Sequence, residues 1–522
     1  MRASKSNPCI LFDLPCGVNN QLDQSQVSQR KHPRTFWRYS GMGITASSTG
    51  RDCLLSAVGG NPALVTFHGG LLQGGLLYQP LAVQPYNLNW PVTPIAVTFP
   101  KTSQQVAEIV KCAADNGYKV QPKSGGHSYG NYGLGGTDGA VVVDLKHFQQ
   151  FSMDETTYHA TIGAGTLLGD VTSRLYKAGG RAMAHGVCPH VGVGGHFTIG
   201  GLGPTSRQWG SALDHVEEVE VVLANSSIVR ASNTENPDVF FAVKGAAASF
   251  GIVTEFKVRT EPAPSEAVQY SYTLNLGSAH ERARLFKDWQ AFISNPNLTR
   301  KFGTVLTILD HGILLSGTFY GSKDEYDALD LENRFPLTGP GEVIVLTDWL
   351  GMTGHAIEDL VVGIAGDVPC SFYAKSMSFT PDSLIPSSAI DDLFNYLDTV
   401  DKGTPTWFIS FDLEGGATND YAVNATAYSH RNALYWLQSY AISPLGPVSD
   451  TTIEFLNGIN RLIAKSMPQA DLSAYPGYVD PLMRNAQSAY WGPNLPRLQG
   501  IKASIDPKDV FHNPQSVNVA KD

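Results

Sequence analysis

Two glycine-rich stretches constrain the fold of this chain more than any other part of its sequence. The first, SGGHSYGNYGLGG, covers residues 124–136 and places one histidine among six glycines. The second, HGVCPHVGVGGHFTIGGLG, covers residues 185–203 and contains one cysteine. Glycine lets the backbone turn tightly and lets amide groups approach a ligand closely. The two stretches therefore predict loops around a ligand, with His127 and Cys188 as their nucleophilic side chains.

The residues before the first loop predict a β-α-β unit. Residues 95–99 alternate as a strand, and the next helix has Thr102 as its N-cap and Gln105 as the capping-box partner. Gly117 ends this helix, and residues 118–121 form a second strand that leads into the loop. Further along the chain, strands are predicted at residues 139–145 and 250–260, and a hairpin at 216–232.

A change of pattern near residue 264 predicts a second domain. The Pro-rich segment EPAPSEA, residues 261–267, breaks the chain. Strands such as ILLSGTFYG then alternate with amphipathic helices such as SAIDDLFNYLDTV until about residue 468, which is α+β patterning. The polar residues 17–50 predict disorder, so residues 1–50 are interpreted as a leader or a mis-annotated start of the chain.

Composition limits the classes of binding partner and the cellular compartment expected for this chain. The net charge is −10 and no long basic run is present, which argues against nucleic acid and anionic membranes as partners. No apolar run is long enough to span a bilayer, and the N-terminal apolar run is interrupted, which makes it a poor signal peptide. Glycosylation sequons nevertheless favour a secreted protein. They begin at Asn225, Asn297 and Asn424.

Three interpretations of the glycine loops compete. The G-x-G-x-x-G fingerprint of a Rossmann fold is incomplete. A match that starts at Gly192 and one that starts at Gly201 both lack the third glycine. Phosphate binding without a Rossmann fold stays open. A zinc or copper site lacks any known ligand spacing, so we rank it below a cofactor site and expect no metal. Ordinary loop packing is the third interpretation. The potential metal ligands are His127, His185, Cys188, His190 and His196.

The motifs, taken together, resemble a known family. PKSGGHSYG, HGVCPHVGVGGH, ENPDVFFAVKGAAASFGIVTEF, TAYSHRNALYWLQ and YWGPNLPRLQGIKASIDPKDVFHNPQSV are similar to berberine-bridge-like FAD-linked oxidases of the vanillyl-alcohol-oxidase type. Within that family the chain resembles the fungal gluco-, xylo- and chito-oligosaccharide oxidases, over residues 51–522. The resemblance implies an FAD-binding domain in two parts, 51–264 and 470–522. It also implies a substrate domain, 265–469, whose antiparallel sheet roofs the flavin and carries flanking helices.

The resemblance also implies how the cofactor is held. FAD would be bound twice, through His127 to the 8α-methyl carbon and through Cys188 to C6. A disulfide between Cys53 and Cys112 is implied as well. One departure is visible at residues 246–248, where three alanines replace the usual glycine run, so this loop must adjust if it needs a positive φ. The implied contacts to the cofactor are Ser124, Gly125, Gly126, Ser128, Gly194, Gly195, Gly200, Gly201 and Ile252.

The implied reaction is oxidation of the reducing-end sugar. Tyr478 matches the family's catalytic base and Asp412 the carboxylate beside it. A free tyrosine has a pKa near 10, so a nearby carboxylate that takes its proton has a chemical reason to be there. The product is a lactone, which water opens to an aldonic acid, and O2 becomes H2O2. The alternatives are an oxidase of an alcohol or secondary metabolite and a flavin-free binding protein.

The implied substrate contacts combine aromatic and polar side chains. Aromatic rings stack on the apolar faces of sugars, and Tyr129 and Phe408 are such candidates, with Tyr435 and Trp436 as further ones. Gln438 matches a sugar-binding glutamine. Ser410 and Thr307 stand where the glucose-type enzymes carry a glutamine and a glutamate, which leaves the preferred sugar open. We expect a monomer.

Overall fold

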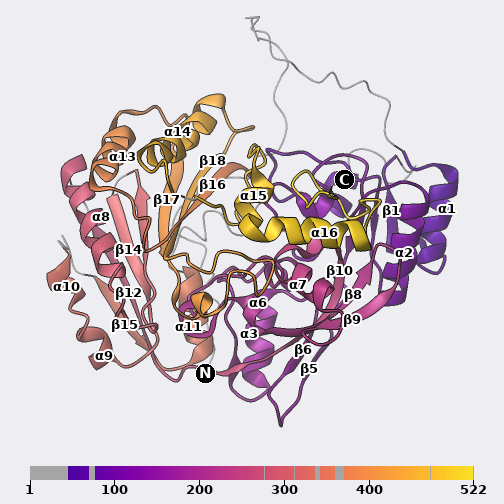
Figure 1. Cartoon of the computed structure of the whole chain (residues 1–522), viewed down its shortest axis with the longest axis horizontal. Coiled ribbons are helices and arrows are strands. Elements are labelled where there is room, and N and C mark those ends of the chain that lie inside the picture. The colour runs from indigo at the N-terminus through magenta and orange to yellow at the C-terminus, as the bar shows by residue number, and fades with distance from the viewer. Residues whose placement is uncertain are drawn as a thin grey trace, which may run out of the picture.

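The computed structural model describes residues 45–69, 77–274, 277–310, 312–335, 341–358, 369–470 and 472–520. The fold is α+β, as predicted, and its described residues form a four-stranded, a five-stranded and a two-stranded sheet beside one large antiparallel sheet (Figure 1). The leader expected at residues 1–50 lies mostly outside the described residues, but helix α1 (Ser48–Ala57) already begins within it. No helix in the described ranges is long and apolar enough to cross a membrane.

The predicted β-α-β unit is confirmed in the first sheet, whose strand order is β1-β2-β4-β3. β4 lies between β2 and β3 and pairs in parallel with both. The Thr102 hydroxyl caps helix α2 by accepting from Gln105 N at 3.2 Å. The Gln105 side chain accepts from Lys101 N instead of completing the expected capping box. The elements are β1 (Val65–Phe67), β2 (Ala96–Thr98), α2 (Ser103–Asp115), β3 (Val120–Lys123) and β4 (Val141–Asp144).

The second sheet is antiparallel, with the strand order β5-β6-β10-β8-β9. The predicted hairpin forms its β8-β9 edge, and the strand predicted at residues 250–260 is β10. Helices α3 (Leu168–Lys177) and α7 (Pro237–Ala246) follow β6 and β9 along the chain. The strands are β5 (Phe151–Met153), β6 (Ala160–Gly163), β8 (Val216–Leu223), β9 (Ile228–Ser232) and β10 (Gly251–Val258).

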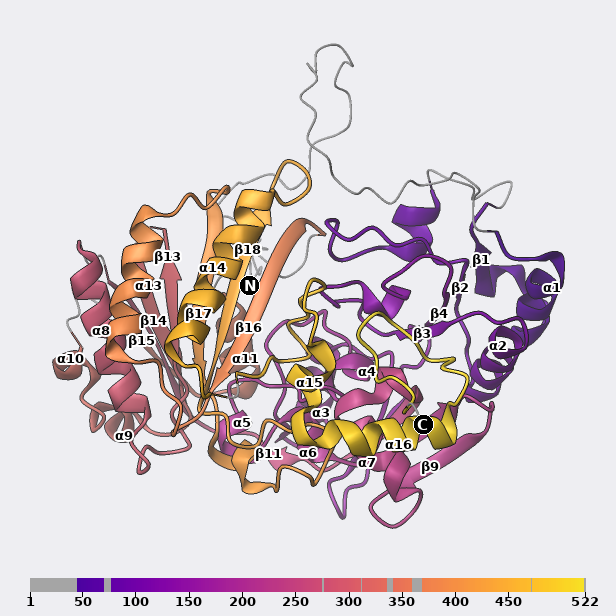
Figure 2. The same cartoon turned by 45° about the horizontal axis from the view of Figure 1, so that its top comes forward.

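The third sheet has seven antiparallel strands in the order β15-β12-β14-β13-β17-β18-β16. Three long helices form a layer that covers one face of this sheet, and these are α8 (Ala279–Ile293), α13 (Ser387–Thr399) and α14 (Asp450–Ser466) (Figure 2). Their apolar side chains and the helix-facing side chains of the strands make one core. The strands are β12 (Ala267–Leu274), β13 (Val305–Leu309), β14 (Gly312–Phe319), β15 (Glu342–Leu346), β16 (Ser371–Phe379), β17 (Thr406–Leu413) and β18 (Tyr435–Ser443).

The alternation of side chains along these strands decides which residues can reach a ligand. On β17, Phe408, Ser410 and Asp412 point away from the helices and line a cavity, whereas the odd-numbered residues between them pack in the helix-side core. On β18, Trp436 lines the same cavity, but Tyr435 lies in the helix-side core. Tyr435 is therefore excluded as a platform for a substrate in that cavity.

The two ends of the described chain are tied to the first sheet. A disulfide joins Cys53 of α1 to Cys112 of α2, as predicted. The C-terminal helices α15 (Ala486–Trp491) and α16 (Leu495–Ile505) return to the indigo and magenta part of the chain (Figure 2). Val120 N of β3 donates to Val510 O at 2.9 Å. The segment after residue 470 thus completes the part built by the first 260 residues, and the domain boundaries at 264 and 470 stay a prediction.

Candidate active site

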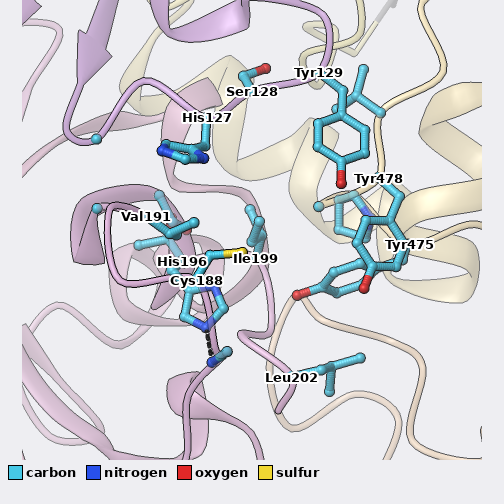
Figure 3. Close-up of a pocket in the computed structure, with 18 of the residues that line it drawn as sticks. His127, Ser128, Tyr129, Cys188, Val191, His196, Ile199, Leu202, Tyr475 and Tyr478 are labelled. Atoms are coloured by element: carbon cyan, nitrogen blue, oxygen red, sulfur yellow. Dashed lines mark hydrogen bonds between the residues drawn. The ribbon is translucent and has the colours of Figure 1, made fainter. Parts of the chain in front are cut away.

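A cavity of about 540 Å³ lies between the large sheet and the part of the chain that carries both glycine-rich loops (Figure 3). One side is formed by β17 and β18 with the adjoining ends of β13 and β14. The other side comes from segments within residues 121–133 and 186–204, and residues 245–249 and 475–479 complete the walls. The two loops singled out in the sequence therefore meet at one site.

The glycines of these loops allow the two backbones to touch. A Cβ atom on Gly125 would lie 2.4 Å from Gly192 N, and one on Gly192 would lie 2.1 Å from Gly125 N. Ser124 joins the loops further, because its hydroxyl donates to Ala164 O at 2.7 Å and accepts from Gly194 N at 3.3 Å. Part of the glycine content is thus required by contact between the loops themselves.

The two nucleophilic side chains predicted to bind the cofactor share this cavity. His127 comes from the first loop and Cys188 from the second, and both are half-buried. Figure 3 shows both on the side of the cavity opposite Tyr478. The ring of Tyr86 lies against the imidazole of His127, with centroids 4.5 Å apart and planes inclined by 32°. An imidazole and a thiol therefore line the same cavity.

The neighbouring histidines hold the second loop. Burial lowers the pKa of His196 to about 3, so its imidazole is neutral, and its Nε2 accepts from Gly186 N at 2.8 Å. Burial also lowers the pKa of His185, whose Nδ1–H donates to Gly186 O at 2.7 Å. His185 Nε2 then accepts from the Thr172 hydroxyl at 2.9 Å. Within the described ranges, no group of three His, Cys, Asp or Glu side chains could hold a metal ion.

Most of the predicted cofactor contacts line the cavity, and three do not. Gly200 packs against the Tyr428 ring, and Gly201 N donates to the Tyr475 hydroxyl at 2.9 Å. Ile252 is buried in the second sheet's core, although both of its neighbours along β10 line the cavity. A role for these three in binding stays a prediction. The residues that do line it are Ser124, Gly125, Gly126, Ser128, Gly194 and Gly195.

The three alanines at residues 246–248 need no adjustment of the loop. The left-handed backbone lies one residue earlier, at Gly245, which has φ of 145°. A Cβ atom there would lie 2.3 Å from Tyr428 N. Ala246 and Ala247 have φ of −149° and −48°, which any residue adopts. The glycine retained at 245 therefore carries the conformational requirement of this loop.

Tyr478 and Asp412 form the opposite side of the cavity. Burial raises the pKa of Asp412 to about 7. Burial first, and then the nearby Tyr129 and Asp412, raise the pKa of Tyr478 well above its ordinary value. Its ring stacks on Tyr129 with centroids 5.9 Å apart and meets Tyr475 edge-on at 5.1 Å. Near neutral pH the phenol thus keeps its proton while the carboxylate changes its charge.

A second carboxyl group lies two residues beyond Asp412. Glu414 is buried, and burial followed by repulsion from Asp412 raises its pKa well above the usual range. The positive charge of Arg207 opposes this shift without reversing it. Two buried carboxylates so close cannot both ionise near neutral pH. The negative charge of the pair is therefore carried by Asp412.

The predicted substrate contacts are brought together, with one exception. Gln438 Nε2 donates to the Tyr129 hydroxyl at 3.0 Å, and both side chains line the cavity with Phe408 and Ser410. Thr307 is fully buried and is not a lining residue. Its hydroxyl lies 3.1 Å from that of Ser410, so these two groups satisfy each other. Contact between Thr307 and a substrate stays a prediction.

The walls fit a flavin nucleotide. The two loops line the cavity with glycine backbone, at Gly125 and Gly126 in the first and at Gly194 and Gly195 in the second, so their amide groups can approach a ligand closely. The imidazole of His127 and the thiol of Cys188 supply two nucleophiles for an electrophilic ring. The buried Tyr132 hydroxyl lines the cavity and has no hydrogen-bond partner among the described residues. It is thus available to a polar group of the ligand.

Two aromatic residues of this site were missed by the sequence analysis. Tyr475 precedes Tyr478 by three residues in AYPGYVD, and this proximity was a usable signal. Tyr86 lies in no motif, about forty residues before His127, and nothing in the sequence pattern places it beside that imidazole. Only the long-range packing of the chain brings it there.

Comparison with known proteins agrees with this geometry. A family described as FAD binding domain matches residues 94–232, and a second, described as berberine and berberine like, matches residues 474–518. The chain is 43% identical over 478 residues to the FAD-linked oxidoreductase sorD of Penicillium rubens, which covers 91% of this chain and 99% of the relative.

Solved structures of two carbohydrate oxidases have the same fold. Xylooligosaccharide oxidase from Myceliophthora thermophila, in complex with xylobiose, superposes with a TM-score of 0.82 at 31% identity over 91% of this chain and all of that one. Glucooligosaccharide oxidase from Acremonium strictum superposes with a TM-score of 0.80 at 30% identity over 91% of this chain and all of that one. The latter carries a 6-S-cysteinyl, 8α-N1-histidyl FAD.

Proposed function

Since the chain belongs to the berberine-bridge-like FAD-linked oxidoreductases, we propose that it oxidises the reducing-end sugar of an oligosaccharide at its anomeric carbon. The product is a lactone, which water opens to an aldonic acid, and O2 is reduced to H2O2. The observation that carries this proposal is the placement of Tyr478 across the cavity from His127 and Cys188, with Asp412 of β17 lining the same cavity. Both solved relatives described above are named as oligosaccharide oxidases, which supports the sugar as substrate.

Tyr478 acts as the base for the anomeric hydroxyl. Its pKa is held far above the usual value, partly by Asp412, so a free phenolate does not accumulate. The phenol therefore passes its proton to Asp412 as it takes the proton of the sugar. Asp412, with a pKa of about 7, is ionised in enough molecules at neutral pH to accept it. Bound FAD supplies the acceptor for the C1 hydrogen with its electron pair, and O2 finally receives both electrons.

The cofactor is held by two covalent bonds in this proposal. His127 would bond the 8α-methyl carbon and Cys188 would bond C6. Three observations support this: both side chains line one cavity, they come from different loops, and the related glucooligosaccharide oxidase carries the same two links. A cofactor fixed at two points leaves the sheet side of the cavity, with Tyr129, Phe408 and Gln438, for the substrate.

A second candidate is an oxidase of an alcohol or secondary metabolite. The hydroxyls of Thr307 and Ser410 satisfy each other at the positions where glucose-type enzymes are expected to carry longer sugar-binding side chains. The relative with 43% identity is described only as an FAD-linked oxidoreductase. H2O2 release separates the candidates, with cellobiose, xylobiose, chitobiose and lactose in one set and benzylic alcohols in the other. If H2O2 were released with the benzylic alcohols and with none of the sugars, a sugar would be ruled out as the substrate.

Replacement of Tyr478 by phenylalanine tests the base. Anaerobic reduction of the flavin by an active sugar should slow by about 10²- to 10⁴-fold, because general-base catalysis contributes that much. The flavin spectrum should stay unchanged, since only one hydroxyl is lost. Tyr158→Phe is the matched control, because Tyr158 is 42% exposed at the surface. A Tyr478→Phe variant that is reduced as fast as the parent would remove the basis of the proposed mechanism.

We further propose that the protein is secreted as a glycosylated monomer. All three sequon asparagines, Asn225, Asn297 and Asn424, are exposed. The Cys53–Cys112 disulfide also suits an oxidising compartment. Removal of N-linked glycans from protein secreted by a fungal host should lower its mass, and light scattering should give the mass of one chain. An unchanged mass after deglycosylation would contradict the glycoprotein proposal.

A further inference from the structure

The segment that carries Tyr478 passes around the outer edge of the large sheet. β16 is the edge strand, and its Ser376 pairs with Gln438, so the Ser376 side chain is on the cavity face. On that face the Ser376 hydroxyl accepts from Tyr475 N at 3.0 Å. Ser378 N donates to Ser473 O at 3.0 Å, which attaches the segment to the same strand. Tyr475 and Tyr478 therefore lie on the cavity side.

Five residues after Tyr475 the segment is on the other face. Asp480 is 1% exposed and accepts from Lys375 Nζ at 2.5 Å and from the Tyr373 hydroxyl at 2.9 Å. Tyr373 and Lys375 alternate with the cavity-facing residues of β16, and Tyr373 belongs to the helix-side core. The carboxylate of Asp480 is thus held behind the sheet, outside the cavity, while Tyr478 is held in front of it.

Asp480 is also tied to its own segment and to the C-terminus. Its carboxylate accepts from Leu482 N at 2.9 Å, and its backbone carbonyl accepts from Gln515 Nε2 at 2.8 Å. Gln515 Oε1 in turn accepts from the Tyr490 hydroxyl at 2.9 Å. A buried carboxylate is costly unless it is paired and hydrogen-bonded, and an apolar anchor would hold a loop without that cost. In some proteins such charged, directional contacts are retained because they restrict the chain to one position.

We propose that Asp480 and Lys375 are a positioning pair that fixes the hydroxyl of Tyr478 relative to Asp412. The inference rests on the proposed role of Tyr478 as base. Tyr478 is two residues from the anchor. Its N–H donates to Tyr475 O at 3.0 Å, and its ring stacks on Tyr129 and meets the ring of Tyr475 edge-on. A misplacement of about 1 Å at a reacting group can slow a reaction about 10²-fold. Neither Lys375 nor Asp480 lines the cavity.

The test removes both charges together, in the variant Lys375→Met/Asp480→Asn, so that neither remains unpaired in a buried place. The matched control is Lys287→Met/Asp391→Asn, an ion pair of 2.6 Å between α8 and α13 in the same helix layer. Flavin reduction by cellobiose should slow about 10- to 100-fold in the first variant, with little change in KM and in flavin content. The control should keep the parental rate.

Hydrogen exchange provides a readout that needs no turnover. Peptides covering residues 473–485 should exchange faster in the Lys375→Met/Asp480→Asn variant, while peptides from α14 should not. Lys375→Arg, which keeps the positive charge, should retain most of the parental rate of flavin reduction. If the double variant does not fold, Tyr373→Phe removes one hydrogen bond to Asp480 and should slow reduction about 3-fold. Unchanged exchange over residues 473–485 would overturn the inference whatever the substrate.

A double-mutant cycle distinguishes this inference from the proposed function. In a Tyr478→Phe background, loss of the Lys375–Asp480 pair should cause no further slowing, because both changes act through one hydroxyl. If Tyr478→Phe alone has no effect, the proposed base is wrong. If Tyr478→Phe slows reduction but the Lys375→Met/Asp480→Asn variant keeps the parental rate, the positioning pair is wrong and the base stands.

Discussion

The Asp412→Asn variant tests the electrostatics of the site without any substrate. Burial raises the pKa of Asp412 to about 7, against about 3.9 for a free aspartate. Between these two pH values the folded chain keeps a proton that the unfolded chain has released, so the free energy of unfolding falls as the pH rises. A difference of about 3 pKa units corresponds to about 4 kcal/mol lost by pH 8.

Asparagine carries no charge, so the variant escapes this loss. The Tm of the variant minus that of the parent should therefore increase between pH 4.5 and pH 8, by several degrees if about 2–4 kcal/mol is recovered. Thermal unfolding followed by tryptophan fluorescence at both pH values measures this difference. Asp392→Asn on the exposed side of α13 is the control, and its difference should not depend on pH. If the Tm of Asp412→Asn minus that of the parent were the same at pH 4.5 and at pH 8, the Asp412 carboxyl would not have a raised pKa.

The same carboxyl sets the pH dependence of the reaction. Only ionised Asp412 can accept the proton of Tyr478, so the rate of flavin reduction in the parent should rise as the pH passes through about 7. In the Asp412→Asn variant the rate should be lower and this rise should disappear. Stopped-flow reduction from pH 5.5 to 8.5 records both effects. A variant that keeps the parental inflection would assign it to another group.

Three further predictions concern the cofactor loops and the disulfide. Acid-precipitated protein should stay yellow when either His127 or Cys188 is replaced and lose its flavin only when both are; an acid-soluble flavin from the parent would contradict the double link. Gly125→Ala places a methyl 2.4 Å from the opposite backbone and should lower both Tm and the flavin-to-protein absorbance ratio, unlike Gly500→Ala, whose added methyl has nothing within 4 Å. Replacing Cys112 by serine should lower the free energy of unfolding by roughly 4 kcal/mol, because the disulfide closes a loop of 59 residues. An unchanged Tm would contradict this prediction.

Local signals predicted the elements near the cofactor loops well. Thr102 and Gly117 mark the two ends of α2 because capping and left-handed backbone are decided by a few adjacent residues. The same holds for the hairpin β8-β9 and for the loops around His127 and Cys188. The predicted bond between the Thr102 hydroxyl and Gln105 N is confirmed, and only the reciprocal half of the capping box is wrong, because the Gln105 side chain accepts from Lys101 N.

Long-range packing was beyond the reach of the sequence pattern. The order of the seven-stranded sheet brings β16 beside β18 although residues 380–434 separate them, and this order decides which residues meet. The pairing of Ser410 with Thr307 follows from it. The contact of Tyr86 with His127 likewise joins segments that are distant in the sequence. Strand periodicity alone places Tyr435 and Trp436 on opposite faces, yet it does not say which face carries the cavity.

The fold gives two aspartates near Tyr478 different electrostatic surroundings. Asp480 is held by the ammonium of Lys375 and the hydroxyl of Tyr373 behind the sheet. Asp412, in front of it, has no salt bridge within the described part of the chain, and burial alone raises its pKa to about 7. An ammonium beside Asp412 would stabilise the ionised form and lower its affinity for the proton of Tyr478. The ammonium of Lys375 therefore pairs with Asp480, which anchors the chain, and not with Asp412, which has to accept a proton.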